Sequence, residues 1–236
     1  MNWKDIKIST DKTHFGLNDK PLFDKQFLEV LKFHEPGIAP VKDETGSYHI
    51  TALGNELYKK RYTRTFGFYC NRAAVINGNE WFHVNEFGER VYSESYFWTG
   101  NFQENLCTVR DENNNYFYIK LNGERLNDLN YIYCGDFKDE IACVKTKSGF
   151  YKHINKVGKF INDKEFLDLG VFHKNFATAK DIKGWFHIDL NGEELYKNRY
   201  LNVEPFYNGF ALVEDFNNRK LIIDEKGGKV INIYSS

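Results

Sequence analysis

A glycine-centred motif recurs along the whole chain at a spacing of 34 or 35 residues, and this period constrains the fold more than any other feature. The glycine closes a turn that follows an apolar strand. Its copies are Gly54, Gly88, Gly123, Gly158, Gly192 and Gly227. A fixed period of this length is the signature of a repeat architecture in which each repeat is one small supersecondary unit. The chain is therefore predicted to fold as a series of similar units.

Three further repeat positions keep the same spacing as the glycine. An apolar residue precedes the turn, a small residue lies in the preceding strand, and an aromatic residue follows the turn. The apolar position is held by Ile50, Val84, Ile119, Ile154, Ile188 and Ile223; the small one by Ala39, Ala73, Cys107, Ala142, Ala177 and Ala211; the aromatic one by Tyr62, Tyr96, Tyr131, Phe166 and Tyr200. Positions that stay in step over the whole chain indicate that the period is structural.

Residues 3–33 are predicted to form a further, degenerate copy that begins part-way through the repeat. A shift of 35 residues places His49 on His14 and is expected to match Val41 with Ile6. The last copy stops after Ile231, inside the repeat. The predicted single domain, 1–236, thus consists of the degenerate unit and repeats at about 34–67, 68–101, 102–136, 137–171, 172–205 and 206–236.

Each repeat is predicted to be an antiparallel meander of four short strands joined by polar turns. Around Trp185 the sequence alternates, so that Trp185, His187 and Asp189 point to one face of a strand while Phe186 and Ile188 point to the other. The repeated glycine is expected to adopt the left-handed backbone conformation that a Cβ would penalise.

A meander this small cannot bury its own faces and must stack on its neighbours. We expect an all-β fold of about seven repeats of about 35 residues. Closure as a small β-propeller-like ring is favoured, because the two ends of the chain look like complementary fragments of one unit. The alternative is an open β-solenoid, since the repeat is short beside the 40–45 residues of a WD40 blade.

The repeats resemble the WG-repeat family of bacteria. The family pattern is a phenylalanine, a Gly-x-Ala-x-Val strand, then Trp-Gly-Tyr/Phe-Ile-Asp and a turn glycine. The closest copies here are 206–213, with the sequence FYNGFALV, and 184–192, with the sequence GWFHIDLNG. Phe186 stands where the family's second glycine would be, His187 stands at its aromatic position, and the units are longer. The resemblance implies a scaffold or binding role and supplies no catalytic residue.

The composition favours a cytoplasmic protein without a nucleic-acid or membrane partner. The formal net charge is −1, so the chain lacks the basic field that nucleic acid or an anionic membrane requires. The first residues lack the apolar core of a signal peptide, and no stretch approaches the roughly 18 apolar residues of a membrane span. The four cysteines form no Cys-x-x-Cys pair. We therefore expect reduced thiols, no metal and no cofactor.

One repeat position is occupied mainly by histidine. Its predicted members are His14, His49, His83, His153 and His187, with Tyr118 and Ile222 in the remaining copies. Imidazoles that face a central channel would suit a metal or an anionic ligand. Alternatively, each histidine hydrogen-bonds nearby backbone and packs between units. The tyrosine and isoleucine replacements favour this structural role, because a ligand shell does not accept isoleucine.

Candidate ligand-binding residues are His83, His153, His187, Asp189 and Trp98. The pattern His-x-Asp/Asn could provide a polarised base, although its two side chains lie about 7 Å apart along a strand. Trp98 lies outside the repeated aromatic positions and is a candidate for an exposed surface. No serine or cysteine recurs in step as a nucleophile, so no catalytic residue is assigned.

The predicted function is a non-enzymatic scaffold that presents loops on a rigid frame to another protein or peptide, acting as a monomer. The runner-up is a module that binds a small ligand or carbohydrate through aromatic residues near a central opening. A hydrolase or lyase that uses a His–Asp site in the channel is a third, weaker hypothesis.

Overall fold

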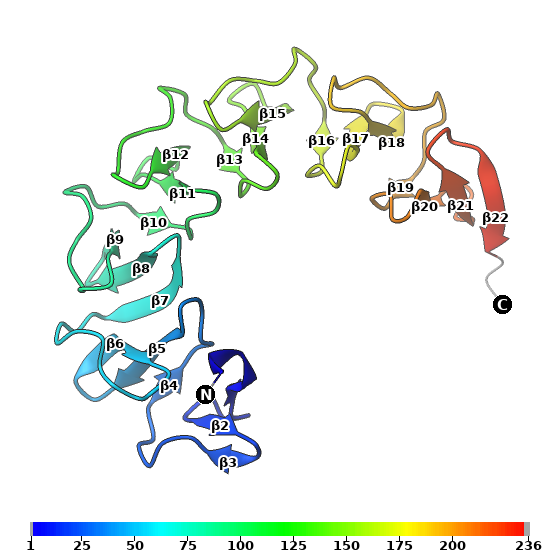
Figure 1. Ribbon diagram of the computed structural model, residues 1–236. Helices are drawn as coiled ribbons and strands as arrows, with labels where there is room; N and C mark the ends of the chain where they lie inside the picture. The colour runs from blue at the N-terminus through cyan, green and yellow to red at the C-terminus, as the bar shows by residue number, and fades with distance from the viewer. Residues whose placement is uncertain (1, 234–236) are drawn as a thin grey trace. The chain divides into compact units, whose positions relative to one another are not determined.

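The computed structural model describes residues 2–233, and within them the chain is all-β, as predicted. These residues form a run of antiparallel sheets, numbered sheet 1 to sheet 7 in chain order, and one short 3-10 helix, η1 (Trp3–Asp5). The sheets fall into two compact units (Figure 1). Unit 1 ends at Leu126 and holds sheets 1–4; unit 2 begins at Asn127 and holds sheets 5–7.

The sheets of unit 1 each contain three strands, and their order in every sheet follows the sequence. Sheet 1 is β1 (Lys7–Ile8), β2 (Phe15–Leu17) and β3 (Lys20–Pro21); sheet 2 is β4 (Glu29–Val30), β5 (Ile38–Asp43) and β6 (Gly46–Thr51); sheet 3 is β7 (Arg64–Tyr69), β8 (Arg72–Asn77) and β9 (Glu80–Val84); sheet 4 is β10 (Trp98–Thr99), β11 (Leu106–Arg110) and β12 (Tyr116–Lys120).

Unit 2 continues the same plan, and its last sheet has a fourth strand. Sheet 5 is β13 (Tyr133–Cys134), β14 (Ile141–Lys145) and β15 (Tyr151–Asn155); sheet 6 is β16 (Asp168–Leu169), β17 (Ala177–Asp181) and β18 (Gly184–Ile188); sheet 7 is β19 (Asn202–Val203), β20 (Phe210–Glu214), β21 (Lys220–Asp224) and β22 (Lys229–Ile233).

The strands of one repeat are distributed over two sheets, which differs from the predicted meander. After β18 the chain contacts its own sheet through the isolated bridges Ile188↔Glu194 and Trp185↔Tyr200 and through a hydrogen bond from the Leu195 amide to the His187 carbonyl, so the predicted third strand is an irregular segment. The predicted fourth strand, near Phe206, is instead the short strand β19, the first strand of the next sheet. Each repeat therefore ends by adding an edge strand to its successor.

The two faces of an interior sheet are both buried, as the alternation predicts. In sheet 3, Phe82 and Val84 on the rear face are 5% and 0% exposed, and His83 on the opposite face is 0% exposed. We call the face that carries the histidine position the forward face, because it packs on the next sheet within the unit. Its rings contact the next phenylalanine, as in His83–Phe102, where the ring centroids lie 4.7 Å apart.

A cation lies over the rear-face ring that precedes the histidine position in four sheets. Arg61, Arg90, Arg125 and Arg199 stack on Tyr48, Phe82, Phe117 and Phe186, with the guanidinium carbon 3.7–4.2 Å from the ring centroid. In sheet 5, Lys152 takes the place of the ring and Phe160 takes the place of Arg90 and Arg125, with the Lys152 Nζ atom 4.7 Å from the ring centroid of Phe160. This exchange preserves the pair and indicates that the cation–π contact matters for the repeat.

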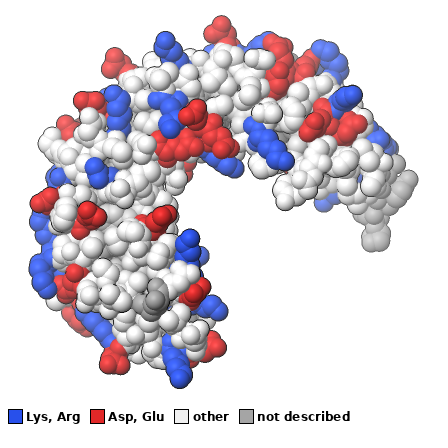
Figure 2. All heavy atoms as spheres, viewed as in Figure 1, with Lys and Arg blue, Asp and Glu red and all other residues white. Residues whose placement is uncertain are grey.

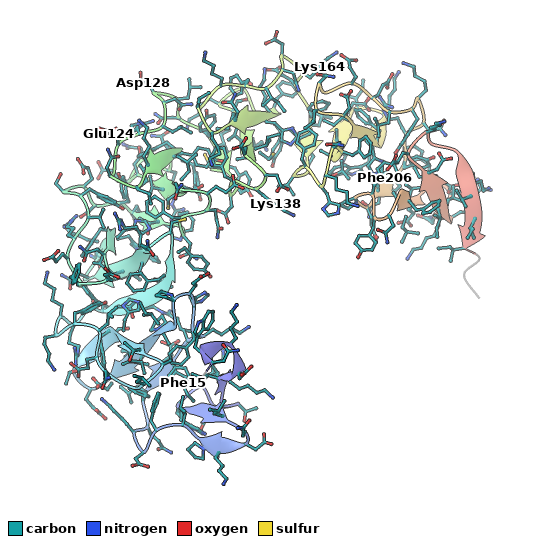
Figure 3. All side chains as sticks on the ribbon, viewed as in Figure 1. Phe15, Glu124, Asp128, Lys138, Lys164 and Phe206 are labelled. Atoms are coloured by element: carbon teal, nitrogen blue, oxygen red, sulfur yellow. The ribbon has the colours of Figure 1, made fainter. Side chains whose placement is uncertain are left out.

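The degenerate first unit does begin part-way through the repeat, but its predicted register is wrong by one residue. The amide of Leu22 donates to the carbonyl of Phe15, as that of Leu57 does to His49 in sheet 2. Phe15, which Figure 3 labels, therefore holds the histidine position and is 1% exposed. His14 lies on the opposite face. The turn after β2 is one residue shorter than in the other repeats, which moves the register.

The strand before β2 is also out of the predicted register. Ile8 pairs with Phe15 as Pro40 pairs with His49, so Val41 corresponds to Ser9 and the predicted match of Val41 with Ile6 is wrong. Sheet 1 lacks the strand that begins each of the other sheets in the described part of the chain.

Two physical constraints require glycine at the repeated turn position, and the sequence predicted one of them. Each copy has a positive φ, for example +68° at Gly88. In addition, a Cβ built on Gly88 would lie 2.6 Å from the ring of Tyr58 in the preceding sheet, and Gly123 and Gly227 meet Tyr92 and Tyr196 in the same way. The glycine is therefore also a point of close packing between repeats.

Gly88→Ala should destabilise unit 1 by roughly 2–5 kcal/mol, from about 1–2 kcal/mol of left-handed backbone strain and about 1–3 kcal/mol of overpacking against Tyr58. Gly78→Ala is the matched control. Gly78 has a φ of +61° but no atom within 4 Å of a built Cβ, so only the strain should remain. Urea unfolding of both variants measures the difference, and equal losses would contradict the packing role.

Candidate functional site

Each histidine on a forward face links its own sheet to the next one. The Nε2 atom of His49 lies 2.7 Å from the carbonyl oxygen of Phe66, and that of His83 lies 3.0 Å from the carbonyl oxygen of Gly100. His153 and His187 make the same contact with Gly170 and Glu204 at 2.8 Å. The acceptor is always 17 residues further along the chain, in the first strand of the next sheet or beside it. The structure therefore assigns the histidine position an inter-sheet hydrogen bond.

The second ring nitrogen meets a tyrosine nine residues further on. Nδ1 lies 2.5 Å from the hydroxyl oxygen in the pairs His49–Tyr58, His83–Tyr92 and His187–Tyr196. A carbonyl only accepts, so Nε2 must carry the proton, and Nδ1 then accepts from the tyrosine hydroxyl. Both nitrogens of these three histidines are thus engaged in a neutral tautomer.

Burial gives these groups displaced pKa values. His49, His83 and His187 are 0% exposed and His153 is 3% exposed. Loss of solvation lowers the pKa of each of these histidines to about 4, against the smaller opposing effect of the hydrogen bond to the carbonyl. Burial likewise raises the pKa of Tyr58, Tyr92 and Tyr196. We call the hydrogen bonds from the tyrosine hydroxyl to the histidine, and from the histidine to the carbonyl of the next sheet, a relay. The side chains of the relay stay uncharged at neutral pH.

Sheet 5 departs from this scheme at the tyrosine. Asn162 stands nine residues after His153, and the Nδ1 atom of His153 is buried without a hydrogen-bond partner among the described residues. The amide nitrogen of Asn162 lies beneath Gly192, where the other repeats place a tyrosine ring. One relay is therefore incomplete.

The Asp or Asn two residues after the histidine stabilises the turn and does not contact the imidazole. Asp189 Oδ1 accepts from the amides of Asn191 and Glu193, both at 2.9 Å. Asn85 and Asn155 accept from the corresponding amides of their own turns. The His-x-Asp/Asn pattern is thus a relay residue followed by a turn cap. Alternation places the two side chains on one face, but the amides of the turn compete for the carboxylate of Asp189 and hold it there.

The structure does not gather the predicted candidates into one site. His83 and Trp98 belong to unit 1, whereas His153, His187 and Asp189 belong to unit 2. Trp98 is half-buried on β10, with its ring centroid 6.3 Å from that of Tyr116. Their binding of a ligand stays a prediction, and for the histidines the geometry favours the structural alternative.

Unit 1 carries a surface groove that sequence reasoning missed. It has a volume of about 430 Å³ and lies at the end of sheet 3 where β8 begins and β9 ends. Its lining residues are Asn71, Arg72, Asn85, Glu86, Phe87, Arg90 and Val91. Phe87 is 67% exposed, which makes it an apolar anchor beside two cations. Basic and acidic side chains are interspersed over the rest of the visible surface (Figure 2).

Arg72 is the residue of this groove that departs from the repeat. The residue before the repeated small residue is apolar in the other full repeats, as in Ile38, Leu106, Ile141, Phe176 and Phe210. Its Nε atom is buried and has no hydrogen-bond partner in the described part of the chain. Arg90, in contrast, is held by the carbonyls of Tyr92 and Glu94 at 2.9 and 2.8 Å. A comparison of repeats for charged residues at apolar positions would have identified Arg72.

Among residues 2–233 no group of three or more His, Cys, Asp and Glu side chains is placed to hold a metal ion. No helix in that range is long and apolar enough to cross a membrane.

Acidification should destabilise the protein between pH 6.5 and 4. Unfolded histidines titrate at about 6.5, so below that pH protons bind the unfolded chain while the four buried imidazoles, with pKa values of about 4, stay neutral. Stability is therefore complete above pH 6.5 and falls by roughly 2 kcal/mol per histidine at pH 5. The measurement is the urea midpoint at pH 7 and pH 5, and an unchanged midpoint would contradict the burial of the relay.

The incomplete relay of sheet 5 offers a repair. Asn162→Tyr should supply the missing hydroxyl to His153 and stabilise unit 2 by about 1 kcal/mol, whereas Tyr196→Phe should leave His187 Nδ1 unsatisfied and cost about 1–3 kcal/mol. Thermal unfolding measures both. Tyr207→Phe, at a 73% exposed tyrosine, is the control and should have no effect. Opposite signs for the first two variants are the essential result.

Comparison with known proteins supports the fold alone. No family model matches this sequence, and no curated protein matches it. Among solved structures, the computationally designed protein Ika8 is 12% identical with a TM-score of 0.50, covering 97% of this chain and 83% of its own. BamB from Moraxella catarrhalis is 12% identical with a TM-score of 0.47, covering 87% and 73%. The C-terminal WD40 domain of Sif2 is 10% identical with a TM-score of 0.44, covering 94% and 76%. The chain is thus an all-β repeat protein with a fold similar to that of Ika8, and its membership of the WG-repeat family stays a prediction.

Proposed function

We propose that this protein is a non-enzymatic scaffold of WG-like repeats that binds another protein or a peptide in the cytoplasm of a bacterium. The observation that supports the proposal is that the repeated polar side chains serve the fold, while other side chains are left free to bind a partner. The repeated histidines and their Asp or Asn neighbours form inter-sheet hydrogen bonds and cap turns, whereas Arg72, which departs from the repeat, lines a surface groove. Loops and turns on a rigid frame are where recognition usually resides.

The groove beside sheet 3 is the proposed contact. Arginine and aromatic side chains dominate the energetics of protein interfaces, and Arg72 and Phe87 lie together here. The guanidinium of Arg72 lines this groove and suits a carboxylate, which guanidinium groups bind through charge-assisted hydrogen bonds. The preferred ligand is therefore a peptide segment with an apolar side chain next to an acidic one.

The carbohydrate alternative rests on exposed aromatic side chains. Phe97 and Tyr133, two of the aromatic residues outside the repeat pattern, are 59% and 48% exposed, while Tyr69 is half-buried like Trp98. These residues lie on different sheets, and the groove contains only one aromatic ring. The peptide hypothesis is therefore preferred.

Panning a random peptide library against the protein tests the proposal. Selected peptides should carry an acidic residue beside an apolar one, and Arg72→Ala and Phe87→Ala should each weaken their binding by at least about tenfold in fluorescence anisotropy. Lys59→Ala, at a side chain that is 93% exposed in the same unit, should leave binding unchanged. Peptides that bind all variants equally would exclude this groove, and binders found only on a glycan array would favour the carbohydrate alternative.

A further inference from the structure

His153 in sheet 5 is buried with one of its two ring nitrogens unpaired. Its Nε2 atom donates to the carbonyl of Gly170, whereas its Nδ1 atom has no hydrogen-bond partner among residues 2–233, and the side chain is 3% exposed. Because Nε2 carries the proton, Nδ1 can only accept. A buried acceptor without a partner lowers the stability of the fold, so this nitrogen favours any small donor that can reach it.

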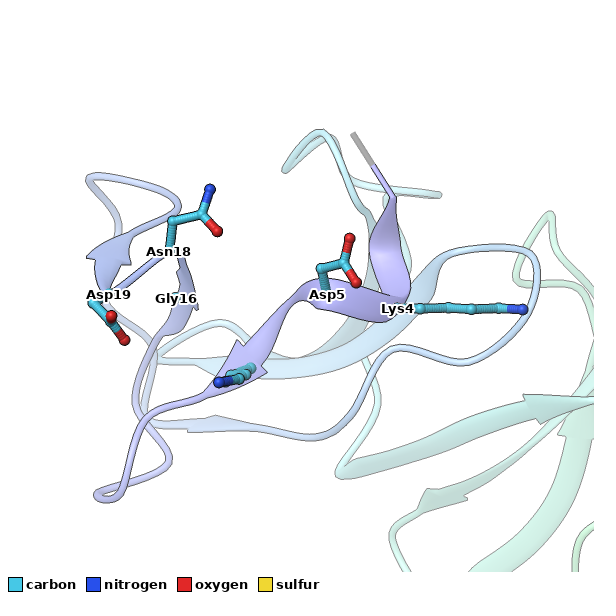
Figure 4. Close-up of a pocket in the computed structure, with 6 residues that line it drawn as sticks. Lys4, Asp5, Gly16, Asn18 and Asp19 are labelled. Atoms are coloured by element: carbon cyan, nitrogen blue, oxygen red, sulfur yellow. The ribbon is translucent and has the colours of Figure 1, made fainter.

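An unpaired buried acceptor distinguishes this place from the open concavities of the protein. The pocket of about 470 Å³ over sheet 1 has exposed polar side chains, so water satisfies them without a ligand (Figure 4). Its lining residues are Lys4, Asp5, Lys7, Gly16, Asn18 and Asp19. That pocket selects no ligand chemistry, whereas one buried atom determines the chemistry beside sheet 5.

Asn162 occupies the place of the relay tyrosine but fills only its base. A Cβ built on Gly123 lies 2.6 Å from Cγ of Tyr92, and one built on Gly192 lies 3.0 Å from Cγ of Asn162. The two side chains therefore leave the backbone in the same direction. Asparagine ends at its amide, where tyrosine continues with the outer ring atoms and the hydroxyl that reaches the histidine. We expect the volume between Asn162 and Nδ1 of His153 to be that of these outer atoms.

An aromatic ring and a surface ion pair border this volume. The ring of Phe172, which is 3% exposed, lies against His153 with the centroids 4.4 Å apart. At the surface, Cγ of Lys164 lies 3.0 Å from a Cβ built on Gly192, and its Nζ atom pairs with Glu193 at 3.0 Å. Both side chains of this pair are at least half exposed, and such pairs contribute little to stability. Lys164 can therefore move aside and admit a small molecule from solvent.

We propose that this volume is a binding site for a small neutral secondary alcohol. The hydroxyl donates to Nδ1 of His153, and the two carbon substituents occupy the places of the ring carbons that flank the tyrosine hydroxyl in the other relays. 2-Propanol has this shape, since its central carbon, hydroxyl and methyl groups match the atoms that Asn162 lacks. A charged ligand is disfavoured, because a buried charge without a partner is costly. The site belongs to unit 2 and is independent of the peptide groove of unit 1.

Water competes with the alcohol for the same nitrogen. A water molecule also donates to Nδ1, but it has no apolar groups to place against the ring of Phe172. Replacement of a loosely held water by an apolar group gains affinity. The binding should nevertheless be weak, with a dissociation constant of about 1–100 mM, because so small a ligand has few atoms to contribute.

Titration of the full chain with 2-propanol up to about 200 mM tests the site by NMR of the histidine rings. The resonances of the His153 ring should shift and saturate, and they should show nuclear Overhauser effects from the methyl protons. Those of His187, whose Nδ1 already accepts from Tyr196, should not change. Acetone has the same shape without a hydroxyl proton, so it should bind about tenfold more weakly.

Asn162→Tyr is the blocking variant, because its own ring would fill the site, and it should abolish the saturable shift. Asn175→Tyr, at an exposed asparagine in the same unit, should bind 2-propanol as the wild type does. The absence of a saturable shift in the wild type overturns the proposal. So does equal binding of acetone, or unchanged binding by Asn162→Tyr. The comparison with acetone needs only the wild type, so it decides the question even if the blocking variant does not fold.

Discussion

Hydrogen bonds from four buried histidines to backbone carbonyls of the next sheet are the directional interactions that hold the repeats of this structure in register. Each three-stranded sheet is too small to be stable alone, so the fold exists only if successive sheets are held in register. Apolar packing is non-directional. The imidazole adds direction, because its Nε2 proton must meet one carbonyl 17 residues further along, as in His187 and Glu204. The tyrosine hydroxyl on Nδ1 then fixes the tautomer.

The glycine, the tyrosine and the histidine depend on one another across two successive repeats. Tyr58 donates to His49 within its own sheet, and its ring lies under Gly88 of the next. A side chain on the glycine would displace the tyrosine, and loss of the tyrosine would leave a buried imidazole nitrogen without a partner, as at His153. Because the fold uses these residues for packing and hydrogen bonds, the proposed recognition falls to groove residues such as Arg72, which departs from the repeat.

The sequence was sufficient to predict the all-β repeat fold, the positive φ of the glycine and the structural alternative for the histidines, because these follow from period and alternation. It was insufficient for the register of sheet 1, since one deleted residue in a turn moves Phe15 into the place expected for His14. Strand pairing between repeats, as for β19, depends on contacts that local patterns do not encode. Tyr58, Tyr92 and Tyr196 lie nine residues after a histidine, and this signal was present but unused. Closure of the repeats into a ring stays a prediction.

The protonation state of the four relay histidines tests the central claim most directly. Nitrogen-15 NMR of the imidazoles distinguishes the two neutral tautomers from the charged ring. His49, His83, His153 and His187 should appear as neutral rings protonated at Nε2 and should remain so down to about pH 5, since burial holds each pKa at about 4. Rings protonated at Nδ1, or titration of these four residues near pH 6.5, would show that the sheets are not joined in this way.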